Sequence, residues 1–390
     1  MTGTMSDVSL SEAVVKLPHC GTDKATAKGY CVNASALYIA SRENAFVVPP
    51  PGSPEGRVCL QEYLDLGYIP QGCSDADVSR SMNYWHSDYA LSRAATTLAK
   101  TTGSDSPPNM PNISYSADAA KLLMSSKNWI KLLDPKTGHF RVKTQEGDFL
   151  PDFDEFAWGP EPGYTEAGPW QYRVEVPYDP RGLQKAFKSM GFDGCDIIQE
   201  ANTILPIFHD GGYGSEIHEQ AEMAVNCWGQ WELNNQPVWI LEHMQVAFDD
   251  TVTGKCAGQA QKWLRQSNSM LHPGADMYPG DEDNGSMGAW FALNMMGFYP
   301  VSPSSGNYTI GSPMFAKVTI DTGGKPLIIA ATNQSPENVY VQSLTFKKTD
   351  QANAYLVVGT EIAYSDMMEG GTLQFTMGPK PASQLADQEL

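Results

Sequence analysis

The spacing of hydrophobic residues changes once along the chain. Between residues 58 and 297, apolar residues recur at intervals of three and four, as at Val78, Met82 and Trp85. This is the spacing of an amphipathic helix. After Pro300, apolar and polar residues alternate, which indicates strands. The pattern therefore predicts a helical region followed by a β-rich tail.

The helical region divides into several helices with recognisable ends. The first is expected over residues 78–100, and the second over residues 116–134 with Ser116 as its N-cap. Further helices are predicted over residues 179–191, 215–231, 237–252, 256–271 and 285–297. The last of these is apolar nearly all round, so we expect it to be buried.

The β-rich tail consists of short, β-branched segments separated by glycine turns. Strands are predicted within residues 316–321, 325–333, 338–347, 354–359 and 372–378. Turn sequences such as TGGK and EGGT lie between them.

These patterns predict three parts. Residues 1–57 are weakly patterned and end in a Pro/Gly linker, FVVPPPGSPEGR. Residues 58–300 are expected to form helical hairpins in series, which commonly assemble into an (α/α) toroid and would form the catalytic domain. Residues 301–390 are expected to form a β-rich, sandwich-like domain. The predicted fold class is therefore mainly α with a β tail.

Composition and charge narrow the possible ligands. Of the 390 residues, 41% are hydrophobic and 18% charged, which is a globular composition. The net charge of -19 disfavours a nucleic-acid partner, because phosphate backbones attract Lys and Arg. Nine Trp and 17 Tyr favour stacking on sugar rings, although a large aromatic core explains them equally well.

The sequence carries few signals for the cellular compartment of the protein. The seven Cys show no CxxC pair, and their odd number leaves at least one thiol outside any intrachain disulfide. No apolar run is long enough to span a membrane, and the N-terminus lacks the pattern of a signal peptide. N-glycosylation sequons occur at Asn33, Asn112, Asn284, Asn307 and Asn333.

An acidic run precedes the last predicted helix. Asp281, Glu282 and Asp283 stand between Gly280 and Gly285, so they belong to a loop. If that loop is extended, the carboxylates of Asp281 and Asp283 point the same way. They could act as a general base and its support, or the run could stabilise the following helix. The run does not fit an EF-hand calcium loop, which needs a glutamate at its twelfth position, because the twelfth residue counted from Asp281 is alanine.

A second constellation is the glycine-rich approach to Glu216, GGYGSEIHEQAE. Glycine allows the backbone to come close to a ligand, which would place Glu216 at the mouth of a pocket. Alternatively, Glu216 is a capping residue of the helix that follows.

The third constellation is the irregular segment from residue 159 to 183. Trp170 and Tyr172 alternate there with Glu166 and Gln171. Aromatic faces with amide and carboxylate groups suit a polyhydroxylated ligand, but the same rings could fill the core. Two carboxylate centres in separate loops with an aromatic platform outline a glycoside hydrolase, which needs one acid and one base or nucleophile.

Several motifs resemble one family closely. One segment, GYTEAGPWQYRVEVPYDPRGL, is similar to the family pattern Y-T-E-G-N-x-W-Q-Y-x-x-x-V-P-x-D-x-x-G-L. A second segment, PGDEDNGSMGAWFALNMMGFYPVSP, is similar to the family pattern P-G-D-E-D-x-G-x-M-S-x-W-Y-x-x-x-x-x-G-F-Y-P. YTIGSPMFAKVTI also resembles a pattern of the same family. By these motifs, the chain from about residue 37 to 380 resembles glycoside hydrolase family 92, the calcium-dependent exo-α-mannosidases.

The resemblance implies an inverting exo-α-mannosidase, with α-1,2 linkages expected, that acts on mannose-capped glycans of glycoproteins. Glu216 matches the general acid, and Asp281 and Asp283 match the catalytic-base pair. Glu166, Trp170, Gln171, Tyr172 and His218 are expected to contact the sugar. Calcium (Ca2+) is the implied cofactor, with Glu219 and Gln220 as the nearest candidate ligands.

The sequence also departs from the family. The pattern H-G-N-E-P-x-H-H appears here as YGSEIHEQ, so Ile217 replaces proline, and Glu219 and Gln220 replace two histidines. The family's N-terminal β-sandwich and first helical hairpins are expected to be missing. The alternative is therefore a carbohydrate-binding relative with impaired catalysis, or a fragment of a longer enzyme.

The resemblance implies a full-length parent in the secretory pathway or outside the cell. The C-terminal residues ADQEL partly resemble a retrieval signal of the K-D-E-L type. Asn284 should stay unglycosylated, because a glycan next to Asp283 would block the pocket.

Overall fold

A computed structural model describes residues 3–22, 29–53, 55–159, 163–203, 229–231, 233, 235–274, 277–279 and 282–386. The chain forms two compact units. Unit 1 comprises residues 1–178 with 302–306, and unit 2 comprises residues 179–301 with 307–390. The division at residues 57 and 300 expected from the sequence stays a prediction.

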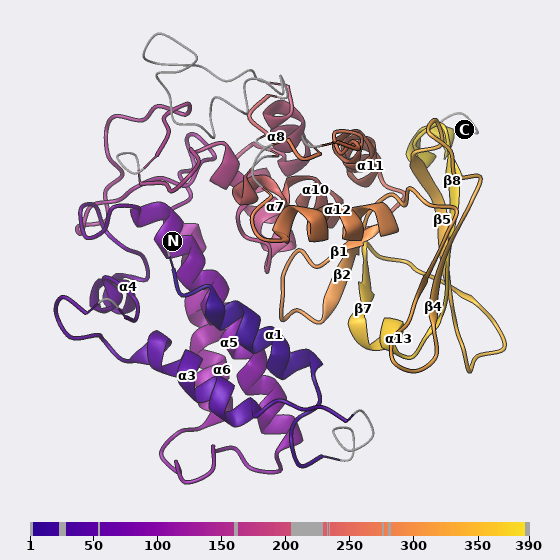
Figure 1. Cartoon of the computed structure of the whole chain (residues 1–390). Helices are drawn as coiled ribbons and strands as arrows, with labels where there is room; N and C mark the ends of the chain where they lie inside the picture. The colour runs from indigo at the N-terminus through magenta and orange to yellow at the C-terminus, as the bar shows by residue number, and fades with distance from the viewer. Residues whose placement is uncertain are drawn as a thin grey trace. The chain divides into compact units, whose positions relative to one another are not determined.

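Unit 1 is built around one long helix. This helix is α5 (Asp77–Thr101), and α1 (Ser6–Lys16), α3 (Ala34–Phe46) and α6 (Tyr115–Ser125) pack alongside it (Figure 1). The core is formed by residues at helical spacing on α5, including Leu91, Ala94, Ala95 and Leu98. Shorter helices complete the unit: α4 (Leu60–Leu66), η1 (Ser126–Lys131) and η2 (Gln171–Val174).

The N-terminal part of unit 1 is more regular than its sequence pattern indicated. The weakly patterned residues 1–57 contain α1 and α3, both packed on α5. Asn33 caps α3 by accepting a hydrogen bond from the backbone of Ala36.

The expected N-cap at Ser116 is wrong. Ser114 caps α6 by accepting from the backbone of Ala117 at 3.1 Å. The helix α6 begins at Tyr115, so Ser116 already lies within it, and the backbone N–H and hydroxyl of Ser116 both donate to Asp105.

Unit 2 begins with helices and ends in two sheets. Its helices are α7 (Pro180–Ser189), α8 (Gly194–Ala201), η3 (Gln236–Val238), α10 (Leu241–Ala247), α11 (Lys255–Asn268), α12 (Ser286–Met296), α13 (Tyr364–Met368) and α14 (Ala382–Ala386). The apolar α12 buries Met287, Trp290 and Phe291, whereas Ala289 and Ala292 are exposed. Burial all round is therefore corrected to burial of one face.

The strands form a five-stranded and a three-stranded sheet. The larger has the order β3 (Lys317–Ile320), β4 (Leu327–Thr332), β8 (Gly371–Gly378), β5 (Tyr340–Lys348), β6 (Tyr355–Leu356). The smaller has the order β1 (Phe298–Tyr299), β2 (Asn307–Ile310), β7 (Glu361–Ala363). The pair β4–β8 is parallel and the other pairs are antiparallel. Both sheets contribute to one hydrophobic core, so the β-rich tail expected from the sequence is confirmed.

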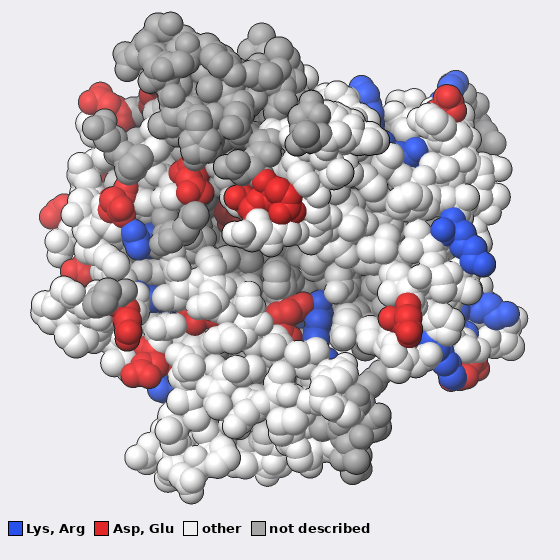
Figure 2. All heavy atoms as spheres, viewed as in Figure 1, with Lys and Arg blue, Asp and Glu red and all other residues white. Residues whose placement is uncertain are grey.

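Three disulfides join the described cysteines. They are Cys20–Cys31 and Cys59–Cys73 in unit 1, and Cys195–Cys256 in unit 2. The seventh, Cys227, lies outside the described residues. Among the described helices, none is long and apolar enough to cross a membrane. On the face drawn in Figure 2, acidic and basic side chains form small separate groups among uncharged residues.

Candidate active site

The acidic run before α12 contains a helix-capping residue. The carboxylate of Glu282 accepts hydrogen bonds from the backbone N–H of Gly285 at 2.5 Å and of Gly288 at 3.0 Å. N–H groups at this end of a helix have no partner within the helix, and the helix dipole favours negative charge there. Helix stabilisation, one of the roles considered for the run, is thus provided by Glu282.

Asp283 differs from its neighbour in backbone conformation. Its φ angle is 58°, and Asn284 and Gly285 follow with φ of 56° and 97°. The extended backbone expected here is therefore wrong at Asp283. A non-glycine residue with positive φ is uncommon, and such conformations are concentrated at functional sites. The side chain of Asp283 is half-buried, and its Oδ2 accepts a hydrogen bond from the side-chain amide of Gln236.

Tryptophans hold the segment that carries Gln236 against α12. The indole N–H of Trp290, on α12, donates to the backbone oxygen of Trp239 at 2.9 Å. The indole of Trp231 donates to the backbone oxygen of Val238 at 3.2 Å. Because Gln236 begins the same short helix, η3, these bonds fix the residue that contacts Asp283. Gln236 was not predicted from the sequence, where only the proline and tryptophan that follow it mark its position.

A buried acid lies just after η3. Glu242, on α10, is fully buried, and burial raises the pKa of its carboxyl to about 8. The next residue, His243, is also fully buried, and burial lowers the pKa of its imidazole to about 4. Its Nε2 lies 2.5 Å from Oδ1 of Asn294, and its ring stacks on Tyr299. The only sequence signal for this pair is an acid and a histidine within an apolar helical run.

The aromatic segment, which we define as residues 163–178, lies in unit 1 with its polar groups turned inward. Gln171 is 1% exposed, and its Oε1 accepts a hydrogen bond from the backbone of Gly168 at 2.9 Å. The hydroxyl of Tyr172 donates to the backbone oxygen of Thr165 at 3.1 Å. Both side chains therefore make hydrogen bonds within their own segment, and their expected sugar contacts stay predictions.

Trp170 and Glu166 belong to the same segment. Trp170 is buried, and its indole N–H has no hydrogen-bond partner among the described residues. The guanidinium of Arg173 lies 4.6 Å from its ring centroid. Glu166 is half-buried and has φ of 53°, a further non-glycine residue in the left-handed region.

The other predicted site residues lie outside the described residues. These are Glu216, His218, Glu219, Gln220 and Asp281. The distance between the carboxyls of Glu216 and Asp283, expected to be about 6.5–9.5 Å for inversion, stays a prediction.

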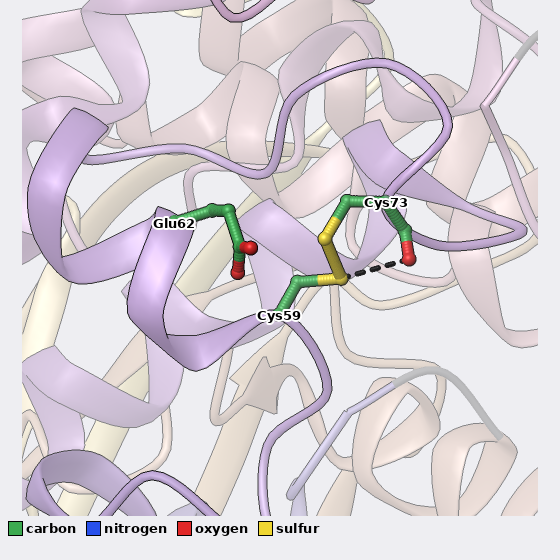
Figure 3. A group of neighbouring side chains, drawn as sticks. All are labelled: Cys59, Glu62 and Cys73. Carbon is green, nitrogen blue, oxygen red and sulfur yellow. Dashed lines mark hydrogen bonds between the residues drawn. A yellow bond between two sulfur atoms is a disulfide. The ribbon is translucent and has the colours of Figure 1, made fainter. Parts of the chain in front are cut away.

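One group of potential metal ligands occurs among the described residues, and it does not fit calcium. Cys59, Glu62 and Cys73 lie together, but the two sulfur atoms form a disulfide (Figure 3). Calcium prefers several oxygen ligands, and this group offers one carboxylate. The expected calcium site therefore stays a prediction.

Helices followed by strands, with a carboxylate loop before α12, agree with the glycosidase class expected from the sequence. Residues 1–379 match the catalytic domain of glycosyl hydrolase family 92, and the chain belongs to this family. The match begins well before residue 37, which corrects the extent expected from the motifs.

Solved structures of the family are similar to this chain. The family GH92 α-mannosidase BT3965 from Bacteroides thetaiotaomicron, in complex with mannoimidazole, is 26% identical with a TM-score of 0.77, and the match covers 98% of this chain and 44% of that one. The inverting mannosidase BT2199 from Bacteroides thetaiotaomicron VPI-5482 is 25% identical with a TM-score of 0.75, covering 98% and 47%. These similarities confirm the predicted fold class.

A curated relative is named an uncharacterized secreted glycosidase of Arthroderma benhamiae. It is 23% identical over 417 residues, which cover 98% of this chain and 46% of that protein. The chain thus spans less than half the length of the relatives it matches.

Proposed function

We propose that the protein is an inverting exo-α-mannosidase that removes mannose from the ends of glycans on glycoproteins, with α-1,2 linkages as the first to test. The observation that carries this proposal is the division of the acidic run. Glu282 caps α12, whereas Asp283 has a left-handed backbone and contacts Gln236. The helix does not need the Asp283 carboxylate as its cap, so a role in catalysis accounts for its position.

In the proposed reaction, the oxygen of a water molecule attacks the anomeric carbon as the glycosidic C–O bond breaks on the opposite face. Asp283, supported by Asp281, takes a proton from that water, and Glu216 gives a proton to the leaving oxygen. One direct displacement inverts the configuration at the anomeric carbon. The sugar is held by Trp170, Gln171, Tyr172, Glu166 and His218.

The names of the relatives support mannose as the sugar, since one is an α-mannosidase in complex with mannoimidazole and another is an inverting mannosidase. Calcium would be held by oxygen atoms near Glu219 and Gln220, and no step above depends on it. Three disulfides and a relative named secreted support a parent protein in the secretory pathway or outside the cell.

The test is to incubate the purified protein with α-1,2-, α-1,3- and α-1,6-mannobiose and to follow the anomeric protons by NMR. We expect β-mannose to appear first, and a chelator to slow its release. Release of α-mannose first would rule out inversion, and a folded protein that releases no mannose would rule out the enzyme.

A second candidate is a mannoside-binding relative without turnover. It is motivated by Glu219 and Gln220, which replace two histidines of the family pattern. Calorimetric titration of the same protein with the mannobioses separates the two, because the second candidate predicts binding without product.

A further inference from the structure

Gln236 lies beside the carboxylate that the proposed function uses as its base. The Nε2 of its side chain donates a hydrogen bond to Oδ2 of Asp283, and the two residues are 47 positions apart in the chain. Gln236 is exposed and Asp283 is half-buried, so water can reach the pair. The contact therefore lies where a reacting water molecule can meet it.

The backbone of Gln236 is held on both sides. Its N–H donates to Oδ1 of Asn235 at 3.0 Å, and its carbonyl oxygen accepts from the backbone N–H of Trp239 at 3.1 Å. The next residue is Pro237, and a proline restricts the backbone dihedral angles of the residue before it. The indole hydrogen bonds described above also hold η3 against α12. The side chain of Gln236 therefore extends from a fixed point.

Asp283 is fixed from its own side of the contact. Its backbone is in the left-handed region, with φ of 58°. The adjacent Glu282 accepts the N–H groups of Gly285 and Gly288, so the carboxylate of Asp283 is not needed as the helix cap. Two anchored backbones thus bring one amide and one carboxylate together, and only side-chain rotation can separate them.

The hydrogen bond suits one protonation state of Asp283. An ionised carboxylate accepts hydrogen bonds and cannot donate, whereas the Nε2 of an amide donates and cannot accept. The bond is stronger when the acceptor is charged, so it favours the form of Asp283 that can take a proton from water. It also limits rotation of the carboxyl group, which restricts the direction of the second oxygen.

We propose that Gln236 is a positioning residue for the hydrolysis: its amide holds the Asp283 carboxylate in one orientation, with one oxygen bonded and the other turned to the attacking water. The inference rests on the proposed function, in which Asp283 takes the proton from that water. A glutamate at position 236 would act in the opposite sense, because two carboxylates in contact cannot both stay ionised without a large cost.

The titratable groups around this pair are few among the described residues. Neither η3 nor α12 contains a charged residue or a histidine. The acidic loop contributes Tyr278 and Glu282, and α10, which follows η3, contributes the fully buried Glu242 and His243. Asp281 lies outside the described residues. Because Glu282 is the nearest of these in the chain, it is the group that an experiment must separate from Asp283.

Kinetics on a mannobiose test the role of the amide. Gln236→Met keeps the length of the side chain and removes its donor, so kcat should fall about tenfold while KM stays nearly constant. Gln236→Glu places a second carboxylate against Asp283, so the acid limb of the kcat/KM profile should move up by about one pH unit or more. The matched control is Gln266→Glu, which adds the same charge at an exposed glutamine of α11 and should leave the limb in place.

A second measurement needs no turnover. The side-chain amide of Gln236 is followed by ¹H–¹⁵N NMR of glutamine-labelled protein, and its signal is assigned by its loss in Gln236→Met. We expect this signal to move as the pH is lowered from about 7 to about 4, where carboxyl groups take up protons. Asp283→Asn should abolish the movement, and Glu282→Gln should leave it unchanged.

The two measurements separate this inference from the proposed function. An amide signal that ignores pH, or that follows Glu282 and not Asp283, overturns the positioning role even if mannose is released. Mannose release with wild-type kcat in Gln236→Met, or with an unmoved acid limb in Gln236→Glu, also overturns it and leaves the enzyme. A signal that follows Asp283 in a protein that releases no mannose keeps the hydrogen bond and removes the reaction it was proposed to serve.

Discussion

The acidic loop, which we define as residues 277–285, and the aromatic segment both have sequences that indicate sugar binding, yet their polar groups are used differently. In the aromatic segment, Gln171 and Tyr172 bond to backbone groups of the same segment and are buried. In the acidic loop, Asp283 is half-buried with positive φ. The comparison teaches that polar residues among aromatics can serve the fold whenever a backbone group lies within reach.

The largest expected effect tests the acidic loop. Asp283→Asn should lower kcat about 10²–10⁴-fold, because an amide cannot take a proton from water. Asparagine tolerates a left-handed backbone, so the melting temperature should stay close to that of wild type. Steady-state kinetics on a mannobiose, with circular dichroism melts, measure both. Glu282→Gln is the neighbouring control, and an equal loss of kcat in that variant would contradict the division of roles.

A second effect concerns α10, the helix that follows η3. Glu242 follows η3 and has its pKa raised from 4.5 to about 8, so the folded state binds more protons between these values. Its contribution to stability is therefore complete below pH 4.5 and is lost as pH rises towards 8, with a slope of up to about 1.4 kcal/mol per pH unit.

Glu242→Gln should remove this slope. Urea unfolding of both proteins between pH 5 and 8 measures it. Parallel curves for wild type and variant would show that Glu242 is charged in the folded protein.

A third, smaller effect tests whether the aromatic segment is structural. A Cβ atom on Gly168 would lie 2.3 Å from the backbone oxygen of Ala157. Gly168→Ala should therefore lower the free energy of unfolding by about 1–3 kcal/mol, as overpacking does. Gly324→Ala is the control, since its Cβ would meet no atom within 4 Å. Equal unfolding midpoints in urea for the two variants would break the comparison.

The smallest expected effect tests the capping role within the acidic loop. Glu282→Ala should lower the free energy of unfolding by about 1 kcal/mol, because the N–H groups of Gly285 and Gly288 lose their acceptor. Glu282→Gln keeps an acceptor and should lose less. Thermal melts of the two variants side by side decide, and an identical loss would mean that charge alone matters.

Helices and strands whose hydrophobic residues recur with a clear period were predictable from the sequence. Residues 78–100 match α5, residues 179–191 match α7, and the alternating tail matches the five-stranded sheet. In contrast, α1 and α3 were not predicted, because their buried faces include polar residues such as Asp7, Ser11 and Ser41. The three short strands of the smaller sheet were missed as well.

Features that join distant segments were not predictable. The cap of α6 is Ser114 and not Ser116, and Asp105, from an earlier loop, accepts hydrogen bonds from both serines at this helix start. Seven cysteines allow many pairings, and only the folded chain brings the three observed pairs together. His139 belongs to no motif, and its contacts with Phe153 and Trp170 exist only in the folded chain.

The sequence by itself determined the order of helices and strands and the place of the acidic loop, because hydrophobic period and turn residues act over short distances along the chain. Tertiary structure decided which partner Asp283 meets. Glu282 and Asp283 are neighbours of the same charge, but Glu282 reaches the N–H groups of Gly285 and Gly288 close by in the chain, whereas Asp283 meets Gln236, 47 residues away. A side chain's chemistry depends on its burial and its partners, and both are set only when segments far apart in the sequence come together.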